Sequence, residues 1–263
     1  MHEKKENKRD LLANERRKKI LELLQEDGSA RVKVLSGVFQ VTEPTIRQDL
    51  EKLEQEGHII REHGGAYLKT ISQQVSSLSL QHLENLDKKS KIAAKALSFI
   101  NDGDSLILDS GSTVTELAKL LSGRNGLTVI TNALNIALLL GANPSCQLLV
   151  TGGEFKPPTL SLTGEQAAAF FNNAYVDKLF LAAGGISSNM ELTYPSFNDL
   201  PVKRAMIRSA QETFLLADSS KFGNASFASL GSISQVNYII TDKELSKSMQ
   251  DQVSSLGVTV IIA

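Results

Sequence analysis

The sequence contains a single cysteine, Cys146, among its 263 residues. One thiol can form neither a disulfide framework nor a thiolate metal cage, and this scarcity is typical of proteins from a reducing cytoplasm. No run of about 18 apolar residues is present, so we expect no membrane-spanning helix and no membrane partner. The first ten residues are charged and lack an apolar core, which argues against a signal peptide. These absences predict a protein of the cytoplasm.

Motifs for common cofactors are missing as well. The sequence has no GxGxxG turn for a dinucleotide and no GxxxxGK[ST] loop for a nucleoside triphosphate. It has no HExxH motif, and its four histidines are scattered along the chain. We therefore expect neither a cofactor nor a metal ion.

Charge does not single out a partner. The formal net charge is −1, and residues 1–70 carry 14 Lys and Arg residues against 13 Asp and Glu residues. Because nucleic-acid-binding domains usually carry a basic patch, this near-neutrality gives little support for DNA binding. An inference of DNA binding must therefore rest on the pattern and placement of residues. The length, with 41% hydrophobic and 22% charged residues, suits one small and one medium-sized globular domain.

Three helices are predicted near the N-terminus. Apolar residues recur with helical spacing in residues 14–26, 32–39 and 42–56. Thr42 is a favourable N-cap for the third helix, and Gly57 suits the position after its last turn. Only residues 40–41 join the second and third helices, so these helices must cross steeply, as in a helix-turn-helix. Residues 58–69 then read as strand, glycine turn and strand, which predicts a β-hairpin wing.

The third helix carries polar side chains opposite an apolar stripe. In the major groove Arg47 can hydrogen-bond guanine and Gln48 can hydrogen-bond adenine, whereas Thr45 can contact a phosphate or a thymine methyl group. Other polar residues near the helix can meet phosphates. The candidate DNA-binding residues are Thr42, Thr45, Arg47, Gln48, Lys52, Arg61 and His63.

An alternative stays open for this region. Glu43, Asp49 and Glu51 reduce the attraction of one domain for phosphate, so we expect a dimer that engages two half-sites. On spacing alone, the three helices could also form a module for protein contacts in which Arg47 is merely solvated.

The second half of the chain has a different pattern. Residues 1–13 read as a charged tail, 14–69 as the helix-turn-helix domain and 70–82, rich in Ser and Gln, as a linker. In residues 83–263 apolar runs alternate with amphipathic segments, which predicts a mostly parallel sheet covered by helices on both faces. The predicted strands are residues 105–109, 127–131, 147–151, 178–183, 213–217, 236–241 and 258–262. The predicted helices are residues 88–100, 114–121, 134–140, 165–172, 202–210 and 243–253.

Residues 109–113 follow a predicted strand and open a predicted helix. Backbone N–H groups at a helix N-terminus bind anions, and the hydroxyls of Ser110, Ser112 and Thr113 add donors. Ligands of parallel sheets bind at the carboxyl ends of the strands. This string therefore predicts a phosphate site, with a plain helix cap as the alternative.

Other predicted strands end in similar residues, and these ends converge on one rim of the sheet. Lys203 and Lys221 could neutralise a phosphate there, although Lys203 could also be solvated beside Arg204. The candidate effector-binding residues are Asp109, Ser110, Gly111, Ser112, Thr113, Thr131, Asn132, Gly152, Gly153, Lys203, Asp218 and Lys221.

Together these residues resemble the DeoR family of bacterial regulators of sugar metabolism. The N-terminal similarity lies in residues 17–21, 41–50, 57 and 61–66. The C-terminal similarity lies in residues 109–113, 131–132, 151–153, 202–205 and 217–223. The resemblance covers nearly the whole chain from Asn14 onward.

The resemblance implies a sensor domain similar to ribose-5-phosphate isomerase and a phosphorylated sugar as effector. It also implies repression of a sugar-catabolic operon through double-stranded operator DNA, by a homo-oligomer (dimer or tetramer) in the bacterial cytoplasm, associated with the nucleoid when bound to DNA. The chain departs from the family pattern at residues 182–185, 194–197 and 199–201, and these departures concern the identity of the sugar.

Two other functions are alternatives: an activator, and an aldose–ketose isomerase with an attached helix-turn-helix. Isomerisation needs a carboxylate base beside the substrate carbon. The segment that resembles the acidic loop of the isomerases, residues 183–185, contains no acid. We therefore predict a regulator without enzymatic activity.

Overall fold

The structure is a computed structural model that describes residues 13–24, 29–62, 64–68 and 85–263. The chain divides into two compact units, Met1–Ser79 and Leu80–Ala263. The predicted linker, His63 and all but the last residue of the predicted tail lie outside the described residues. Among the helices described, none is long and apolar enough to cross a bilayer.

The smaller unit contains the predicted helix-turn-helix and wing. A first helix covers residues 13–24, followed by β1 (Ser29–Arg31), α2 (Val32–Phe39), α3 (Glu43–Gln55), β2 (Ile59–Glu62) and β3 (Gly65–Leu68). Strands β2 and β3 form the predicted hairpin, and β1 pairs with β3 on its other side. Strand β1 was not predicted, because three residues are too short to show an alternating pattern.

An apolar core unites the three helices and the wing. Ile20, Ile46 and Leu50 are almost completely buried, and Ile59 of β2 packs with them. Gln40, which ends α2, adopts the left-handed conformation with φ of 50°, and this turns the chain sharply toward α3. The short, sharp turn predicted between the two helices is therefore present.

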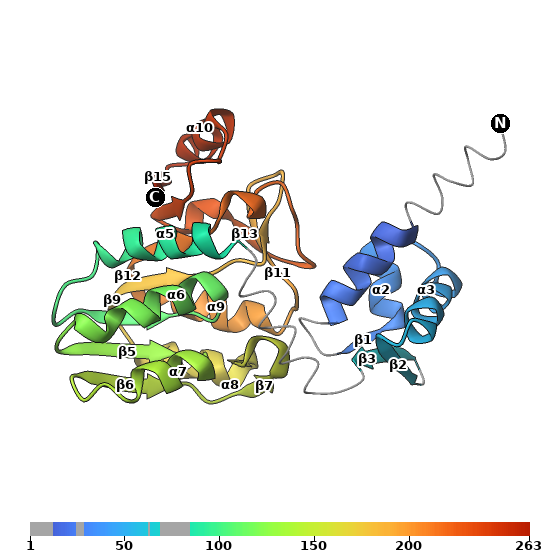
Figure 1. The fold of residues 1–263 in the computed structure, drawn as a ribbon, viewed down its shortest axis with the longest axis horizontal. Helices are drawn as coiled ribbons and strands as arrows, with labels where there is room; N and C mark the ends of the chain where they lie inside the picture. The colour runs from blue at the N-terminus through green and yellow to red at the C-terminus, as the bar shows by residue number, and fades with distance from the viewer. Residues whose placement is uncertain (1–12, 25–28, 63, 69–84) are drawn as a thin grey trace. The chain divides into compact units, whose positions relative to one another are not determined.

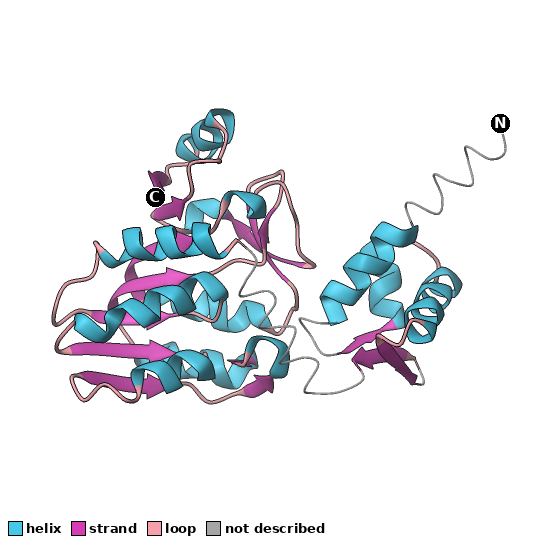
Figure 2. Ribbon diagram, viewed as in Figure 1, coloured by secondary structure: helices cyan, strands magenta, loops and turns pink. Residues whose placement is uncertain are grey.

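The larger unit is built on a seven-stranded sheet in which every pairing is parallel (Figures 1 and 2). In spatial order the strands are β15 (Thr259–Ile262), β14 (Tyr238–Thr241), β12 (Ala210–Leu216), β9 (Val176–Leu181), β4 (Ser105–Leu108), β5 (Leu127–Thr131) and β6 (Cys146–Val150). These are the seven predicted strands, with ends shifted by a few residues. The expected parallel α/β fold is confirmed.

Helices cover both faces of this sheet because side chains alternate along each strand. Leu106 and Leu108 of β4 pack in one apolar cluster with α5 (Leu86–Leu97), α6 (Ser112–Leu120) and α7 (Leu134–Leu140). Ile107, between them, belongs to a second cluster with α8 (Gly164–Ala169), α9 (Asp199–Arg208) and α10 (Lys247–Ser255). Strand β4 therefore packs apolar side chains on both of its faces, which explains the unbroken apolar run Leu106, Ile107, Leu108.

The order of the strands reverses between β4 and β9. From β4 the chain builds outward through β5 to β6, and from β9 it builds in the other direction through β12 and β14 to β15. Ligands of open parallel sheets bind at such a switch point, outside the carboxyl ends of the strands. A ligand site is therefore expected beside the segments that follow β4 and β9.

Two small antiparallel sheets were not predicted. Strands β7 (Glu154–Lys156) and β8 (Ser161–Thr163) form a hairpin. A further sheet has the order β10 (Gly185–Ile186), β11 (Glu191–Tyr194) and β13 (Ala228–Ser232). Their strands have two to five residues, which is too short to show an alternating pattern, and β11 also pairs with β13, which lies far along the chain.

Candidate functional site

Helix α3 presents its polar face as predicted. Ile46 and Leu50 are buried, whereas Arg47, Gln48 and Lys52 are exposed. The Arg47 Nη2 atom lies 2.9 Å from Glu43 Oε2, in an ion pair between two exposed side chains. Such a pair is weak in water, so the Arg47 guanidinium can exchange Glu43 for another partner at small cost.

The N-terminal end of α3 and the wing complete this surface. The hydroxyls of Thr42 and Thr45 lie 2.9 Å apart, just before and in the first turn of α3. Arg61 of β2 donates from Nε to Glu54 Oε2 at 2.7 Å, and this hydrogen bond lowers the pKa of Glu54. His63 lies outside the described residues.

Asp49 does not face DNA as its sequence position suggested. Its side chain is buried, and Arg16 donates from Nε to Asp49 Oδ2 at 2.5 Å. Arg17 Nη1 lies 3.7 Å from Asp49 Oδ1. The negative charge of Asp49 is therefore offset inside the domain by residues of the first helix.

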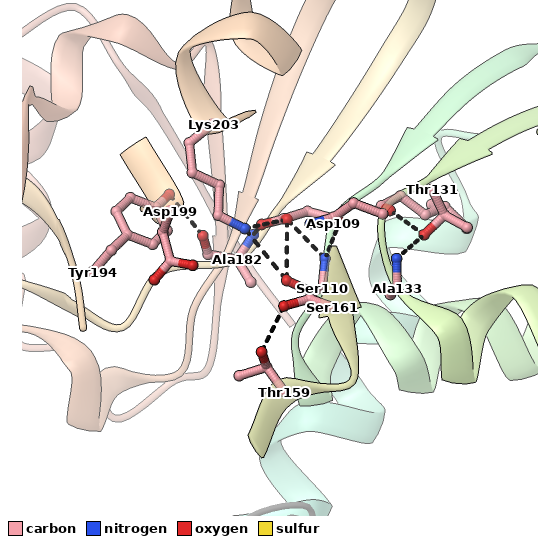
Figure 3. Close-up of polar contacts among 12 residues, drawn as sticks. Asp109, Ser110, Thr131, Ala133, Thr159, Ser161, Ala182, Tyr194, Asp199 and Lys203 are labelled. Atoms are coloured by element: carbon pink, nitrogen blue, oxygen red, sulfur yellow. Dashed lines mark hydrogen bonds and ion pairs between the residues drawn. The ribbon is translucent and has the colours of Figure 1, made fainter. Parts of the chain in front are cut away.

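At the switch point of the larger sheet, Asp109 is completely buried directly after β4 (Figure 3). Its Oδ2 atom accepts a hydrogen bond from Ala182 N at 3.0 Å, and its Oδ1 atom accepts one from Ser110 N at 2.7 Å. Oδ1 also accepts from the Lys203 ammonium, in a buried ion pair. Burial raises the pKa of Asp109, and the charge of Lys203 opposes this shift.

Lys203 is thus not solvated, which was one of the two roles left open by its sequence. Only 3% of its surface is exposed, and its Nζ atom also donates to Ser110 Oγ at 3.4 Å. The ammonium lies 5.4 Å from the centroid of the Tyr194 ring. Lys203 reaches from α9 across the switch point and fixes both the carboxylate and the turn after β4.

Tyr194 is a site residue that the sequence reasoning noted only as a departure from the family pattern. Its hydroxyl donates to Ala182 O at 2.8 Å. Burial raises the pKa of Tyr194 well above its ordinary value, and the carboxylates of Asp109 and Asp199 raise it further. Asp199 in turn accepts from Lys156 Nζ at 3.0 Å. The switch point therefore holds two buried ion pairs with a neutral phenol close by.

The turn from residue 110 to 113 begins α6. A Cβ atom at Gly111 would lie 2.5 Å from the Ala182 Cβ atom, so only glycine lets this turn approach the end of β9 so closely. The first backbone bond of the helix is from Thr115 N to Gly111 O. The N–H groups of residues 112–114 precede this ladder and have no partner within the helix, as at any helix N-terminus.

Thr131 and Asn132, after β5, hold the neighbouring backbone. Thr131 Oγ1 donates to Leu108 O at 2.7 Å. Asn132 Oδ1 accepts from Ser110 N at 3.1 Å, and Asn132 Nδ2 donates to Leu162 O at 3.1 Å. Asn132 therefore holds the turn after β4 beside the β7–β8 hairpin, and Thr131 holds the end of β4.

The end of β6 lies next to the same hairpin. A Cβ atom at Gly153 would lie 2.6 Å from Thr163 O, whereas one at Gly152 would meet nothing within 4 Å. Thr151, just before them, is buried, and its Oγ1 atom has no hydrogen-bond partner among the described residues. Gly153 is thus required by the packing, and Gly152 lines open space.

Asp218 and Lys221 lie in a second polar group, at the ends of β12 and β14. Asp218 is buried and accepts from Ser220 N at 3.0 Å, which caps the short helix η4 (Ser219–Lys221). Asp242, after β14, accepts from Ser219 N at 2.6 Å. Asp242 was not a candidate, although the strand-end argument that selected Asp218 applies to it as well.

The architecture defines a class of protein: a winged helix-turn-helix unit joined to a parallel α/β unit with a polar switch point. Comparisons with known proteins identify the family. The DeoR-like helix-turn-helix domain matches residues 16–72, and the DeoR C-terminal sensor domain matches residues 84–243. The chain belongs to the DeoR family of helix-turn-helix transcriptional regulators.

Individual relatives agree with this assignment. The chain is 37% identical to the uncharacterized HTH-type transcriptional regulator YulB of Bacillus subtilis, over 89% of this chain and 91% of the relative. It is 33% identical to the transcriptional repressor GlcR of B. subtilis (92% of this chain, 93% of the relative) and 33% identical to the lactose phosphotransferase system repressor of Lactococcus lactis (88% and 91%). These relatives are transcriptional regulators and not enzymes, which argues against the isomerase alternative.

Among solved structures, the chain is similar to ribose 5-phosphate isomerase A of Methanocaldococcus jannaschii, with 19% identity and a TM-score of 0.40 over 52% of this chain and 55% of that chain. It is also similar to eIF2B delta of Chaetomium thermophilum, with 15% identity and a TM-score of 0.44 over 76% and 64%. The fold of this chain is established by its own strand order and by the family matches.

Proposed function

We propose that this DNA-binding regulator represses a sugar-catabolic operon and is released from its operator by a phosphorylated sugar. The names of relatives such as the lactose phosphotransferase system repressor support sugar metabolism as the setting. The observation that carries the proposal is the position of α6. Its N-terminus starts directly after the central strand β4, at the switch point, with three hydroxyl side chains around it.

The phosphate of the effector binds the turn of residues 110–113. Free N–H groups at a helix N-terminus favour an anion, and the hydroxyls of Ser110, Ser112 and Thr113 supply further donors. Asp109 does not repel this anion, because Lys203 neutralises it in the buried ion pair. Lys221, on η4 after β12, supplies the positive charge from further along the same rim, with β9 between β12 and β4.

The remaining candidate residues shape the rim. Thr131 and Asn132 hold the turn after β4, Gly153 closes the hairpin, and Gly152 leaves space beside it. Asp218 fixes the turn that carries Lys221. Their part in effector binding is to set the shape of the site.

The DNA interface uses the exposed side of α3 and the wing. Arg47 and Gln48 read base edges, whereas contacts to the sugar–phosphate backbone come from Thr42, Thr45, Lys52, Arg61 and His63. Two copies engage two half-sites, in a dimer or tetramer. Residues 14–69 bind DNA, residues 83–263 bind the effector, and the two parts reorient about residues 70–82. A regulator of a bacterial operon works in the cytoplasm, where its operator lies.

Calorimetry tests the phosphate site directly. The full-length protein is titrated with inorganic phosphate, glucose 6-phosphate, fructose 6-phosphate, ribose 5-phosphate and glycerol 3-phosphate, and with the unphosphorylated form of each organic compound. We expect at least one phosphorylated compound to bind, and its unphosphorylated form to bind at least about ten times more weakly, a loss of about 1.4 kcal/mol. Equal affinities for the two forms would rule out a phosphate at this turn.

A variant assigns the binding to α6. Ser112→Asp places a negative charge in the first turn and should abolish binding of the phosphorylated compound. The matched control is Ser248→Asp, which makes the same change at an exposed position in the first turn of α10. Binding that survives in Ser112→Asp, or that is lost equally in both variants, would place the site elsewhere.

A further inference from the structure

The first residue that the structure describes after the predicted linker is Asn85, and it contacts the turn that carries Lys221. Asn85 adopts the left-handed conformation, with φ of 52°, immediately before α5. Its Nδ2 atom donates to Ser220 Oγ at 3.3 Å and lies 3.5 Å from Asp218 Oδ1. A residue near the entrance to the sensor domain is thereby joined to η4, more than 130 positions further along the sequence.

Lys88, in the first turn of α5, extends this contact. Its Nζ atom donates to Ser219 Oγ at 3.1 Å and to Glu244 Oε2 at 2.6 Å, and it lies 3.8 Å from Asp242 Oδ1. The hydrogen bond to Glu244 raises the pKa of Lys88, and the nearby carboxylates raise it further. Lys88 therefore stays charged and ties α5 to the segments after both β12 and β14.

Asp242 holds the same turn from the other side. Burial would raise the pKa of Asp242, but hydrogen bonds from the N–H groups of Ser219 and Glu244 outweigh burial and lower it. As an ionised group, Asp242 fixes Ser219 at 2.6 Å. Helix η4 is thus clamped between the start of α5 and the end of β14.

Lys88 also offsets the negative charge of the carboxylates that surround it. Asp218, Asp242 and Glu244 bring three carboxylates close to Lys88, and Asp218 and Asp242 are almost completely buried. A phosphate that binds Lys221 must approach this negative group. The Lys88 ammonium offsets part of this repulsion. Because Lys88 contacts Ser219, a displacement of η4 changes the distances between Lys88 and its partners.

We infer that Asn85 and Lys88 are positioning residues that couple the Lys221 turn to the chain segment leading to the helix-turn-helix. The inference rests on the proposed function, because it takes Lys221 as an effector contact. When the phosphate draws Lys221 toward α6, η4 moves and the start of α5 moves with it. The contact formed by Asn85 and Lys88 with residues 218–220 transmits occupancy of the site to the linker.

Lys221 and Lys88 should therefore affect different quantities: Lys221 the affinity for the effector, and Lys88 the coupling between effector binding and operator binding. Lys221→Ala removes an effector contact, so it should raise the effector concentration needed for release while complete release persists at saturation. Lys88→Met removes the mechanical link. It should leave much of the operator affinity intact even when the effector site is saturated, because coupling is a free energy distinct from either binding free energy.

The test uses the full-length protein, a DNA duplex selected from a random library by the wild type, and the panel compound that binds the wild type most tightly. Fluorescence anisotropy gives operator affinity without and with saturating compound, and calorimetry gives the affinity for the compound. We expect the wild-type ratio of operator affinities to be roughly 5 to 150. For Lys88→Met we expect this ratio to fall below about 2, with operator affinity in the absence of compound unchanged.

Controls separate the link from a general loss of charge or stability. Lys91→Met removes an exposed charge from the same helix and should behave as the wild type. Lys88→Arg can still reach Glu244 and Ser219, so it should restore the ratio. The double variant Lys88→Met, Glu244→Gln removes both charges of the ion pair and should stay uncoupled while it binds the compound normally.

The outcomes distinguish the coupling role of Asn85 and Lys88 from the proposed function. A Lys88→Met protein that binds the compound and releases DNA as completely as the wild type would overturn the inference and leave the proposed function intact. If no panel compound releases DNA from the wild type, or if Ser112→Asp responds normally, the proposed function fails and the inference fails with it.

Discussion

Lys203 and Asp109 place two opposite charges where neither reaches water. Bringing a single charge into such a site costs several kcal/mol, and the partner's charge offsets that cost only while both are present. Ser110 N, Ala182 N and Lys203 Nζ satisfy the carboxylate from three segments of the chain. The pair therefore holds three segments together at the switch point. Removing only one of its two charges should destabilise the protein more than removing both.

A variant series should show that dependence. Lys203→Met leaves Asp109 buried without its cation and should lower the free energy of unfolding by about 3–5 kcal/mol. The double variant Lys203→Met, Asp109→Asn removes both charges and should be more stable than the single variant. Urea denaturation followed by circular dichroism measures both, with the exposed Lys243→Met as control. A single variant as stable as the wild type would show that the pair is not buried in solution.

Single residues also mark the limit of what the sequence predicts. Asp109 was identified from its place after an apolar strand, which is a local signal. The role of Lys203 was not decided, because its burial depends on α9 crossing to the end of β4. Asp49 was misinterpreted for the same reason: its partner Arg16 lies 33 positions earlier in the sequence. A charge that is buried through a distant partner cannot be recognised from its neighbours.

At the scale of elements, prediction succeeded where the apolar pattern is strong. The helices repeat apolar residues with helical spacing and the seven parallel strands contain apolar runs, so both were located within a few residues. Strands β1, β7 and β10 have only two or three residues each. Runs this short show no alternating pattern, and β11 pairs with β13 far along the chain, which explains why the two small sheets were missed.

In the proposed DNA interface, specificity depends on helix α3. Arg47→Ala should cost about 1–3 kcal/mol per half-site, because a side chain that bonds a base edge is lost. Lys52→Ala should weaken binding to all sequences alike and make the salt dependence less steep, as expected for a phosphate contact. Titrations of specific and nonspecific duplexes at several salt concentrations measure both effects.

The matched control for these substitutions is Arg204→Ala, on the exposed side of α9 in the other unit. It removes the same charge from the chain and should leave DNA binding unchanged. If Arg47→Ala, correctly folded by circular dichroism, binds the specific duplex as tightly as the wild type, Arg47 does not read a base. A uniform loss across all sequences would instead make it a phosphate contact.

At the scale of the whole molecule, the central question is how one unit controls the other. A ligand can shift an equilibrium only by as much as its affinity differs between the two states. If the phosphorylated sugar weakens operator binding, the operator must weaken sugar binding by the same factor. This reciprocity holds whatever the path of the coupling, so it tests the account without assuming a role for Lys88.

The most direct measurement determines both affinities on the full-length protein. Anisotropy gives the affinity for the selected duplex without and with saturating sugar phosphate, and calorimetry gives the affinity for the sugar phosphate without and with the duplex. The account predicts that each ligand weakens the other by one common factor, roughly 5 to 150, or about 1–3 kcal/mol. Operator affinity that does not change would contradict a sensor of this ligand, and operator affinity that increases would contradict release, making the sugar phosphate a co-repressor.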